Sequence, residues 1–137
     1  MTVAFSIPVR VYYEDTDAAG VVYYANYLRF MERARTEWLR FIGVEIDELA
    51  IHQDTIFAVR SISMEYRSPA RLNDLLEVNL TLKRCNRASL VVAQNIERKE
   101  QLLCEGQAKL VCLHASSFRP RSIPESVLSE INTWKIP

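Results

Sequence analysis

Residues 12–43 read YYEDTDAAGVVYYANYLRFMERARTEWLRFIG and hold the only long helical pattern in the chain. From Leu28 onward, apolar residues recur at intervals of three and four with charged residues between them, which predicts an amphipathic helix with one buried face. Asn26 is a suitable N-cap, and Gly43 follows the last periodic residue, where a left-handed residue commonly ends a helix. The stretch therefore predicts one long helix with defined ends, around which the rest of the chain can fold.

An acidic loop that contains Asp15 and Asp17 leads directly into the start of this helix. The first backbone N–H groups of a helix have no internal acceptor and carry partial positive charge, so they can polarise a carbonyl group. A carboxylate nearby could attack the polarised carbon or activate a water molecule to do so. The two aspartates could equally be ordinary loop residues that accept turn N–H groups. Their spacing alone does not decide between these interpretations.

The length and composition indicate one soluble domain. With 137 residues, 49% of them hydrophobic, the chain is long enough for one core and short for two, so residues 1–137 are expected to form a single domain. Seventeen basic and seventeen acidic residues give a net charge of zero, which argues against nucleic acid as a partner. The N-terminus lacks a signal-peptide pattern and no apolar run approaches the length of a membrane span, so neither export nor stable membrane insertion is expected.

The chain has three cysteines, an odd number without CxxC spacing, at positions Cys85, Cys104 and Cys112. This pattern fits a reducing compartment, so a cytoplasmic location is expected. It also argues against a zinc site, because zinc ligands usually come in closely spaced pairs.

Five further segments show alternation of apolar and polar residues, which is typical of β-strands. They are residues 7–14, 56–66, 76–82, 89–96 and 101–113. Weaker helical patterns occupy residues 44–53 and 125–134. Because short turns join the last four alternating segments, we expect an α+β fold in which a largely antiparallel sheet of about five strands wraps around one long central helix.

Two strand positions and the sheet edges lead to further expectations. Arg60 interrupts an apolar face and should need a polar partner; that face consists of Ile56, Ala58, Ile62, Met64 and Tyr66. The side chains on one face of the last strand are unusually small around Gly106, which leaves room for the long helix to pack there. A sheet of this size has exposed edges, and a homodimer or homotetramer would cover them.

The segments VRVYYEDTDAAGVVYYANYLRFMERARTEWLR (residues 9–40) and EYRSPARLND (residues 65–74) resemble those of a known family. Together with the strand pattern to about residue 113, they are similar to the hotdog-fold acyl-CoA thioesterases of the 4-hydroxybenzoyl-CoA thioesterase superfamily, and in particular to its Tol-Pal-associated, YbgC-type branch. The motif D-x-D-x-x-G-V-V-Y-x-x-N-Y-x-x-x-x-E is long enough to be specific. The resemblance implies a hotdog fold, hydrolysis of short-chain aliphatic or aromatic acyl-coenzyme A, and no cofactor or metal ion.

Carried over from this family, Asp17 matches the catalytic carboxylate, as nucleophile or as general base. The backbone N–H of Tyr24 matches the group that polarises the thioester carbonyl, and Gly20 matches the glycine that lets the loop pass close to the acyl group. Many members of the branch have histidine in place of Tyr24, whereas members acting on aromatic acyl groups often have tyrosine. The resemblance therefore leaves the acyl preference open.

The turn at residues 83–89 matches the family's region that meets the nucleotide end of coenzyme A, and the best-aligned positions are Arg87 and Ser89. Independently of the family, the turn places three cations close together in a neutral chain. Arginine is suited to bidentate contact with phosphate, so such a turn can form a local phosphate site. The alternative is an ordinary solvated hairpin.

Other polar residues and other functions carry less weight. His52 and His114 lie in no recognisable ligand or triad spacing, and Glu32 is either half of a surface ion pair or a group that approaches the site across a dimer. A hotdog dehydratase usually needs a histidine beside its carboxylate, and neither histidine lies in the acidic loop. A non-catalytic hotdog scaffold that binds lipid-synthesis or cell-envelope partners would fold and oligomerise without turning over any acyl-coenzyme A.

Overall fold

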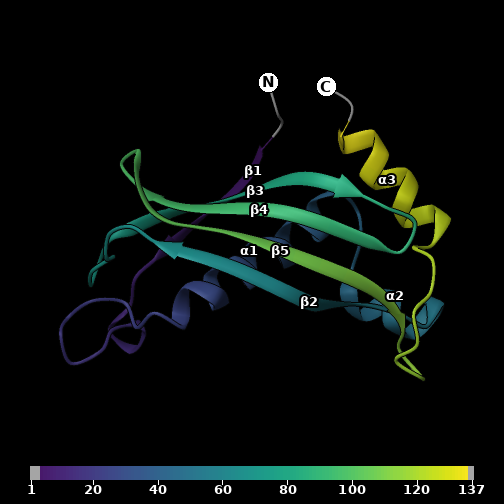
Figure 1. Cartoon of the computed structure of the whole chain (residues 1–137), viewed down its shortest axis with the longest axis horizontal. Helices are drawn as coiled ribbons and strands as arrows, with labels where there is room; N and C mark the ends of the chain where they lie inside the picture. The colour runs from purple at the N-terminus through teal and green to yellow at the C-terminus, as the bar shows by residue number, and fades with distance from the viewer. Residues whose placement is uncertain (1–3, 136–137) are drawn as a thin grey trace.

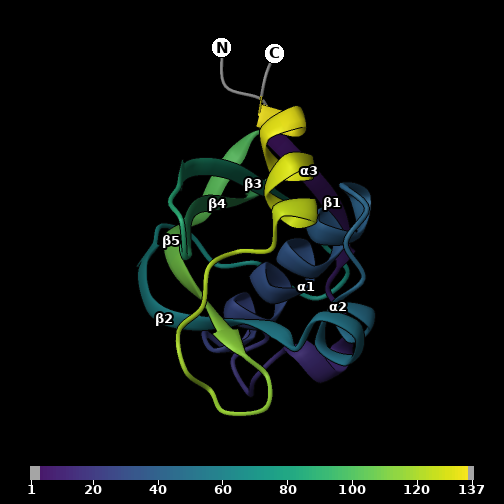
Figure 2. The same ribbon diagram turned by 90° about the vertical axis from the view of Figure 1, so that its right-hand side faces the viewer.

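The computed structural model describes residues 4–135 and consists of one curved sheet wrapped around helix α1 (Asn26–Phe41), as Figures 1 and 2 show. The strands are β1 (Ala4–Arg10), β2 (Thr55–Tyr66), β3 (Leu75–Cys85), β4 (Ser89–Arg98) and β5 (Gln101–His114). They form a single sheet in the order β1-β3-β4-β5-β2, and each neighbouring pair is antiparallel. The α+β class and the antiparallel sheet around one long helix, as in a hotdog fold, are confirmed.

Helix α1 packs one face into the concave side of the sheet, with Phe30 and Trp38 fully buried. It ends as predicted, at a Gly43 with a φ of 95°. The Gly43 N–H donates to the carbonyl oxygen of Arg40 and the Val44 N–H to that of Leu39, which is the Schellman arrangement. The predicted N-cap is wrong. Ala25 occupies the cap position, and Asn26 is the first helical residue.

The first strand was predicted at residues 7–14, but β1 begins at Ala4 and ends at Arg10. A short 3₁₀ turn, η1 (Tyr13–Asp15), follows it. The Asp15 carboxylate accepts the Tyr12 N–H (2.8 Å) and bends the chain out of the sheet. The apolar and polar residues therefore continue to alternate beyond the end of the strand, because the hydrogen bond from the Tyr12 N–H to the Asp15 side chain ends it. Tyr13, which the alternation placed in the strand, is 82% exposed.

Strand β2 contains a bulge between Val59 and Ser61, with Arg60 as the extra residue. A bulge shifts the alternation by one residue. Ile62 therefore faces α1, whereas Ile56 and Ala58 lie on the outer face, opposite Leu113 and Val111. The single apolar face predicted for this strand is wrong for that reason, and within the described residues Arg60 is exposed without an ion pair.

The small site on β5 is confirmed. A Cβ atom on Gly106 would lie 2.6 Å from Sδ of Met64 and 2.9 Å from the carbonyl oxygen of Ser63, both on β2, and 3.5 Å from Cε of Met31, which belongs to α1. A second register shift, beside Ile96, buries Leu103 instead of Leu102 near the start of β5. The close approach of β5 to Met64 and to the β2 backbone thus depends on a residue without a side chain, and Met31 of α1 packs over the same position.

Two shorter helices complete the fold, α2 (Ile46–Gln53) and α3 (Glu125–Lys135), both close to their predicted positions. Helix α3 covers one end of the core, where the rings of Trp38 and Trp134 meet edge to face at 5.5 Å. Burial raises the pKa of Cys104 to about 12, so this thiol is inert at neutral pH. In the part of the chain that the structure describes, no helix is long and apolar enough to cross a membrane.

Candidate active site

Asp17 is the first residue of the turn in a tight hairpin that connects η1 to α1. Thr16 and Val22 form the bridge at its base, and the Asp17 N–H donates to the carbonyl oxygen of Val21 (2.9 Å). The Gly20 N–H donates back to the carbonyl oxygen of Asp17 (3.0 Å), and Gly20 has a φ of 81°. Glycine adopts this left-handed conformation without strain, which explains its place in the hairpin. The space beside Gly20 is open in the single chain, so its predicted contact with an acyl group stays a prediction.

The two aspartates of the loop differ in what their carboxylates contact. The Asp15 carboxylate closes the 3₁₀ turn on the Tyr12 N–H, as described above. Oδ1 of Asp17 accepts the Ala19 N–H (2.9 Å), whereas Oδ2 of Asp17 has no partner among the described residues and the side chain is exposed. Both carboxylates therefore satisfy turn N–H groups. Each also keeps one oxygen without a partner among the described residues, but the Asp17 side chain is exposed whereas that of Asp15 is half-buried.

Tyr24 lies in the turn that starts α1. The Tyr23 N–H donates to the carbonyl oxygen of Asp15 (3.0 Å), and the Asn26 N–H donates to the carbonyl oxygen of Tyr23 (2.8 Å). Because the C=O and N–H groups of one trans peptide unit point in opposite directions, the second bond directs the Tyr24 N–H away from the helix. Within residues 4–135 this N–H has no acceptor. It is a free donor at the positive end of the helix dipole.

Aromatic side chains pack together beside the start of α1. The hydroxyl of Tyr66, the last residue of β2, donates to the carbonyl oxygen of Tyr24 (3.3 Å), and the two rings lie edge to face with centroids 6.3 Å apart. The Tyr66 ring also lies 5.6 Å from that of the buried Tyr27. Partial burial raises the pKa of Tyr66 above its ordinary value, so its hydroxyl stays protonated at neutral pH. Tyr24 and Tyr66 remain 62% and 46% exposed, which leaves room for a ligand or a second chain.

Arg87 lies in the turn between β3 and β4, and Ser89 is the first residue of β4. This turn is at the opposite end of the sheet from the loop that precedes α1 (Figure 1). Strand β3 has 11 residues and begins beside the acidic hairpin, so the two regions are roughly 30 Å apart. Arg87 Nε donates to the hydroxyl of Ser122 (3.1 Å), and Asn86 Nδ2 donates to that of Ser89 (3.3 Å). One chain therefore does not bring the cationic turn and the carboxylate together.

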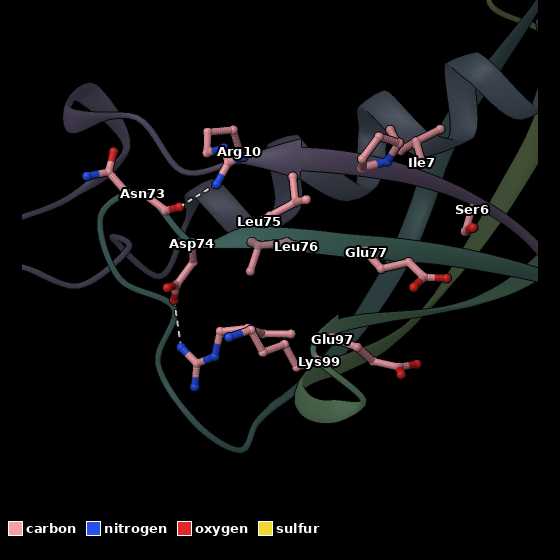
Figure 3. A pocket seen from close by; sticks show the side chains of 12 residues that line it. Ser6, Ile7, Arg10, Asn73, Asp74, Leu75, Leu76, Glu77, Glu97 and Lys99 are labelled. Carbon is pink, nitrogen blue, oxygen red and sulfur yellow. Dashed lines mark hydrogen bonds and ion pairs between the residues drawn. The ribbon is translucent and has the colours of Figure 1, made fainter.

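A cavity lies elsewhere again, on the outer face of β1, β3 and the β4–β5 hairpin (Figure 3). It has a volume of about 750 Å³ and is lined by Arg10, Leu75, Glu77, Glu97 and Lys99, among others. Asp74 forms an ion pair with Arg98 at its rim (2.6 Å). Glu77 and Glu97 are direct cross-strand partners, and no predicted site residue lines this cavity.

The remaining candidates have structural roles. Asp54 accepts hydrogen bonds from the Ser116 hydroxyl and N–H (2.8 Å each) and faces Nδ1 of His114 (3.2 Å). Because the serine donates to the carboxylate and not to the histidine, this cluster does not form an activated nucleophile. His52 is exposed on α2, and Glu32 pairs with Arg35 on α1, as its interpretation as half of an ion pair predicted.

Sequence reasoning missed the contact between Tyr66 and Tyr24, although Tyr66 lies inside a segment that carried the resemblance. An aromatic residue at the end of a strand was the available signal, but its partner is 42 residues away. It also misassigned Asn26, whose side chain donates backward to the carbonyl oxygen of Asp15 (2.9 Å). An asparagine beside a helix start predicts a hydrogen bond between its side chain and nearby backbone. Whether the amide bonds the helix or the preceding hairpin depends on how the hairpin folds, which the local sequence does not show.

Comparison with known proteins connects this site to a family. A model described as "Thioesterase superfamily" matches residues 19–105. The acyl-CoA thioester hydrolase YbgC of Escherichia coli O6:H1 is 44% identical over 94% of this chain and 96% of its own length. Among solved structures, a probable thioesterase from Bartonella henselae has a TM-score of 0.85 at 31% identity, covering 89% of this chain and all of the other. A 1,4-dihydroxy-2-naphthoyl-CoA thioesterase from Synechocystis has a TM-score of 0.88 at 26% identity, covering 98% and 99%.

Proposed function

The chain belongs to the thioesterase superfamily, and we propose that it hydrolyses the thioester bond of acyl-coenzyme A. The observation that carries this function is the free Tyr24 N–H at the start of α1. The Tyr23 N–H and Asn26 Nδ2 on either side of it both donate to the carbonyl oxygen of Asp15, in the segment that leads to Asp17. A donor that is fixed in place before the reaction stabilises an oxyanion without reorganisation. We further propose that residues 1–137 form one catalytic domain.

In this mechanism the thioester carbonyl oxygen accepts the Tyr24 N–H, and the dipole of α1 adds to the stabilisation of the negative charge that develops there. Asp17 acts in one of two ways. Its free oxygen attacks the carbonyl carbon, which gives an acyl-aspartyl anhydride and the coenzyme A thiolate, and water then hydrolyses the anhydride. Alternatively, it takes a proton from a water molecule that attacks the same carbon. Both routes release the acid and the free thiol, and neither uses a cofactor.

We also propose that the active site is completed by a second copy of the chain. Strand β2 is an edge strand of 12 residues, and the side chains on its helix-facing side are only partly covered: Val59, Ile62 and Tyr66 are 45%, 38% and 46% exposed. A long edge with exposed apolar side chains favours pairing with another strand. Pairing of β2 with its copy around a two-fold axis would extend the sheet and cover these side chains.

The same two-fold axis would resolve the separation of the predicted site residues. Tyr66, beside the active-site turn, is at one end of β2, and the β3–β4 turn is level with the other end, since Ser89 and Ala58 share the partner Val111. Antiparallel pairing of the two β2 strands brings the partner subunit's Arg87 and the partner subunit's Ser89 to the end where Asp17 lies. They would contact the nucleotide phosphates of the substrate.

Two further properties follow from the chemistry. The buried thiols suit a reducing compartment, and we propose that the enzyme acts in the cytoplasm. The exposed rings of Tyr24 and Tyr66 can pack against either aromatic or short aliphatic acyl groups. The 1,4-dihydroxy-2-naphthoyl-CoA thioesterase from Synechocystis shows that this fold accommodates an aromatic acyl group.

Release of free thiol from a panel of aromatic and short aliphatic acyl-coenzyme A substrates tests the function. We expect turnover of at least one class, with saturation in substrate. A folded protein that releases thiol from none of them would contradict the proposal and favour the non-catalytic scaffold.

A further inference from the structure

The side chain of Asn26 joins the start of α1 to the acidic hairpin. Its Nδ2 donates to the carbonyl oxygen of Asp15 (2.9 Å), in a partly buried position. The same carbonyl oxygen accepts the Tyr23 N–H (3.0 Å). The backbone two residues before Asp17 is therefore held by two donors that both come from the beginning of the helix.

The backbone of Asn26 acts on the other half of the site. Its N–H donates to the carbonyl oxygen of Tyr23 (2.8 Å), and this peptide unit also contains the Tyr24 N–H. Because the peptide is planar, fixing its oxygen fixes the direction of its N–H. Asn26 therefore bonds both to the segment that carries the carboxylate and to the peptide that carries the free donor.

We infer that Asn26 is a positioning residue that sets the distance between the Asp17 carboxylate and the Tyr24 N–H. This inference rests on the proposed thioesterase function. Misplacing a reacting group by about 1 Å can cost about 100-fold in rate, so a bond that fixes the hairpin to the helix has direct consequences for turnover. Asn26 itself does not contact the Asp17 carboxylate; its side chain bonds the Asp15 carbonyl oxygen.

The helix itself does not require asparagine at this position. The N-cap is Ala25, and alanine is a better helix former than asparagine in a first turn. Replacing Asn26 by alanine should therefore leave the stability of α1 unchanged or raise it slightly. A loss of turnover in such a variant would come from the lost bond to Asp15.

Steady-state thiol release from Asn26→Ala and Asn26→Asp tests the inference. Aspartate is nearly isosteric but cannot donate at neutral pH. We expect kcat to fall about 10- to 100-fold in both variants while KM changes less than about threefold, because substrate contacts are kept and transition-state geometry is lost. The matched control is Asn79→Ala, whose amide bonds Glu97 on the outer face of the sheet (2.7 Å) and which should keep the wild-type kcat. Unchanged kcat in both Asn26 variants, or a rise in KM alone, would overturn the inference.

Hydrogen exchange of residues 14–26 separates this inference from the function on which it rests. We expect faster exchange of this segment in Asn26→Ala than in Asn79→Ala, because the hairpin loses its bond to the helix. If the wild type turned over no acyl-coenzyme A, the proposed function would fail, and this measurement would still decide whether Asn26 holds the hairpin. Equal exchange in the two variants would contradict that role whatever the activity.

Discussion

Nη1 of Arg35 donates to Oε1 of Gln94 across the core (2.8 Å) and joins the middle of α1 to β4. Gln94 in turn donates through Nε2 to the carbonyl oxygen of Met31 (3.0 Å). The two residues are only 6% and 2% exposed. A buried charge is stable only where its donors are satisfied, and the Gln94 amide satisfies one of the Arg35 donors. Because Gln94 belongs to β4 and bonds two residues of α1, it fixes the helix against the sheet.

Gln94→Leu should destabilise the protein by about 2–3 kcal/mol, because the leucine fills the space but leaves the buried Arg35 without this acceptor. Urea unfolding at fixed protein concentration measures the effect. Asn79→Leu is the control, since it removes an amide from a half-buried outer position of β3, and we expect it to cost less than about 1 kcal/mol. Equal losses in the two variants would show that Arg35 does not depend on Gln94.

Arg87→Ala should raise KM for acyl-coenzyme A about 5- to 20-fold with little change in kcat, because a distant phosphate contact stabilises substrate and transition state equally. The comparison substrate is the same acyl group on pantetheine, which lacks the nucleotide. Its KM should be the same for the variant and the wild type. A similar increase for both substrates would show that Arg87 does not contact the nucleotide.

Mixing Arg87→Ala with Asp17→Asn tests whether the site is shared between two chains. In a mixed dimer with shared sites, one site carries both defects and the other carries neither, so activity at low substrate should recover in part. If Asp17 and Arg87 of the same chain formed each site, every site would keep one defect. Mixing would then restore nothing.

The contacts of Asp54 predict a pH dependence of stability. The hydrogen bonds from the Ser116 hydroxyl and N–H, with a smaller effect of His114, lower the pKa of Asp54 below its ordinary value of 3.8. A lowered pKa stabilises the folded state above the unfolded pKa, and that stabilisation is lost as the pH falls through the folded value. Asp54→Asn should therefore be less stable than the wild type near neutral pH. Urea unfolding from about pH 6 to pH 3 should show the difference narrowing below about pH 4, and a constant difference would contradict this role.

The local elements of the fold could be predicted because each has its cause in neighbouring residues. Gly43 ends α1 through its own positive φ, and the alternation in β3 reflects burial on one face of a strand. The bulge at Arg60 could not be predicted, since it depends on how β2 aligns with β5 rather than on the sequence of β2 alone. Because of this bulge, Ile56 and Ala58 face the opposite side of the sheet from Ile62, although the alternation places all three on one face.

The residues of the proposed site come from the family resemblance and stay a prediction, whereas their arrangement comes from the structure. The acidic loop and the helix start are adjacent in sequence, but the resemblance is what selects Asp17 over Asp15 and the Tyr24 N–H as the polarising donor. Asn26 was predicted to cap the helix, whereas its amide bonds the hairpin, because Ala25 already occupies the cap and the Asp15 carbonyl lies within reach. The separation of Arg87 from Asp17 depends on the length of β3 and the strand order, which local patterns do not contain.

The most direct test of the proposed chemistry is the turnover of Asp17→Asn, with Asp15→Asn as the matched control. The amide keeps the size of the side chain and can still accept the Ala19 N–H, but it is neither a base nor a good nucleophile. We predict that kcat for acyl-coenzyme A falls at least about 100-fold in Asp17→Asn, with an unchanged melting temperature and oligomeric state, whereas Asp15→Asn retains most of its turnover. Hydrolysis by Asp17→Asn at close to the wild-type rate would contradict the assignment of Asp17 as the catalytic carboxylate.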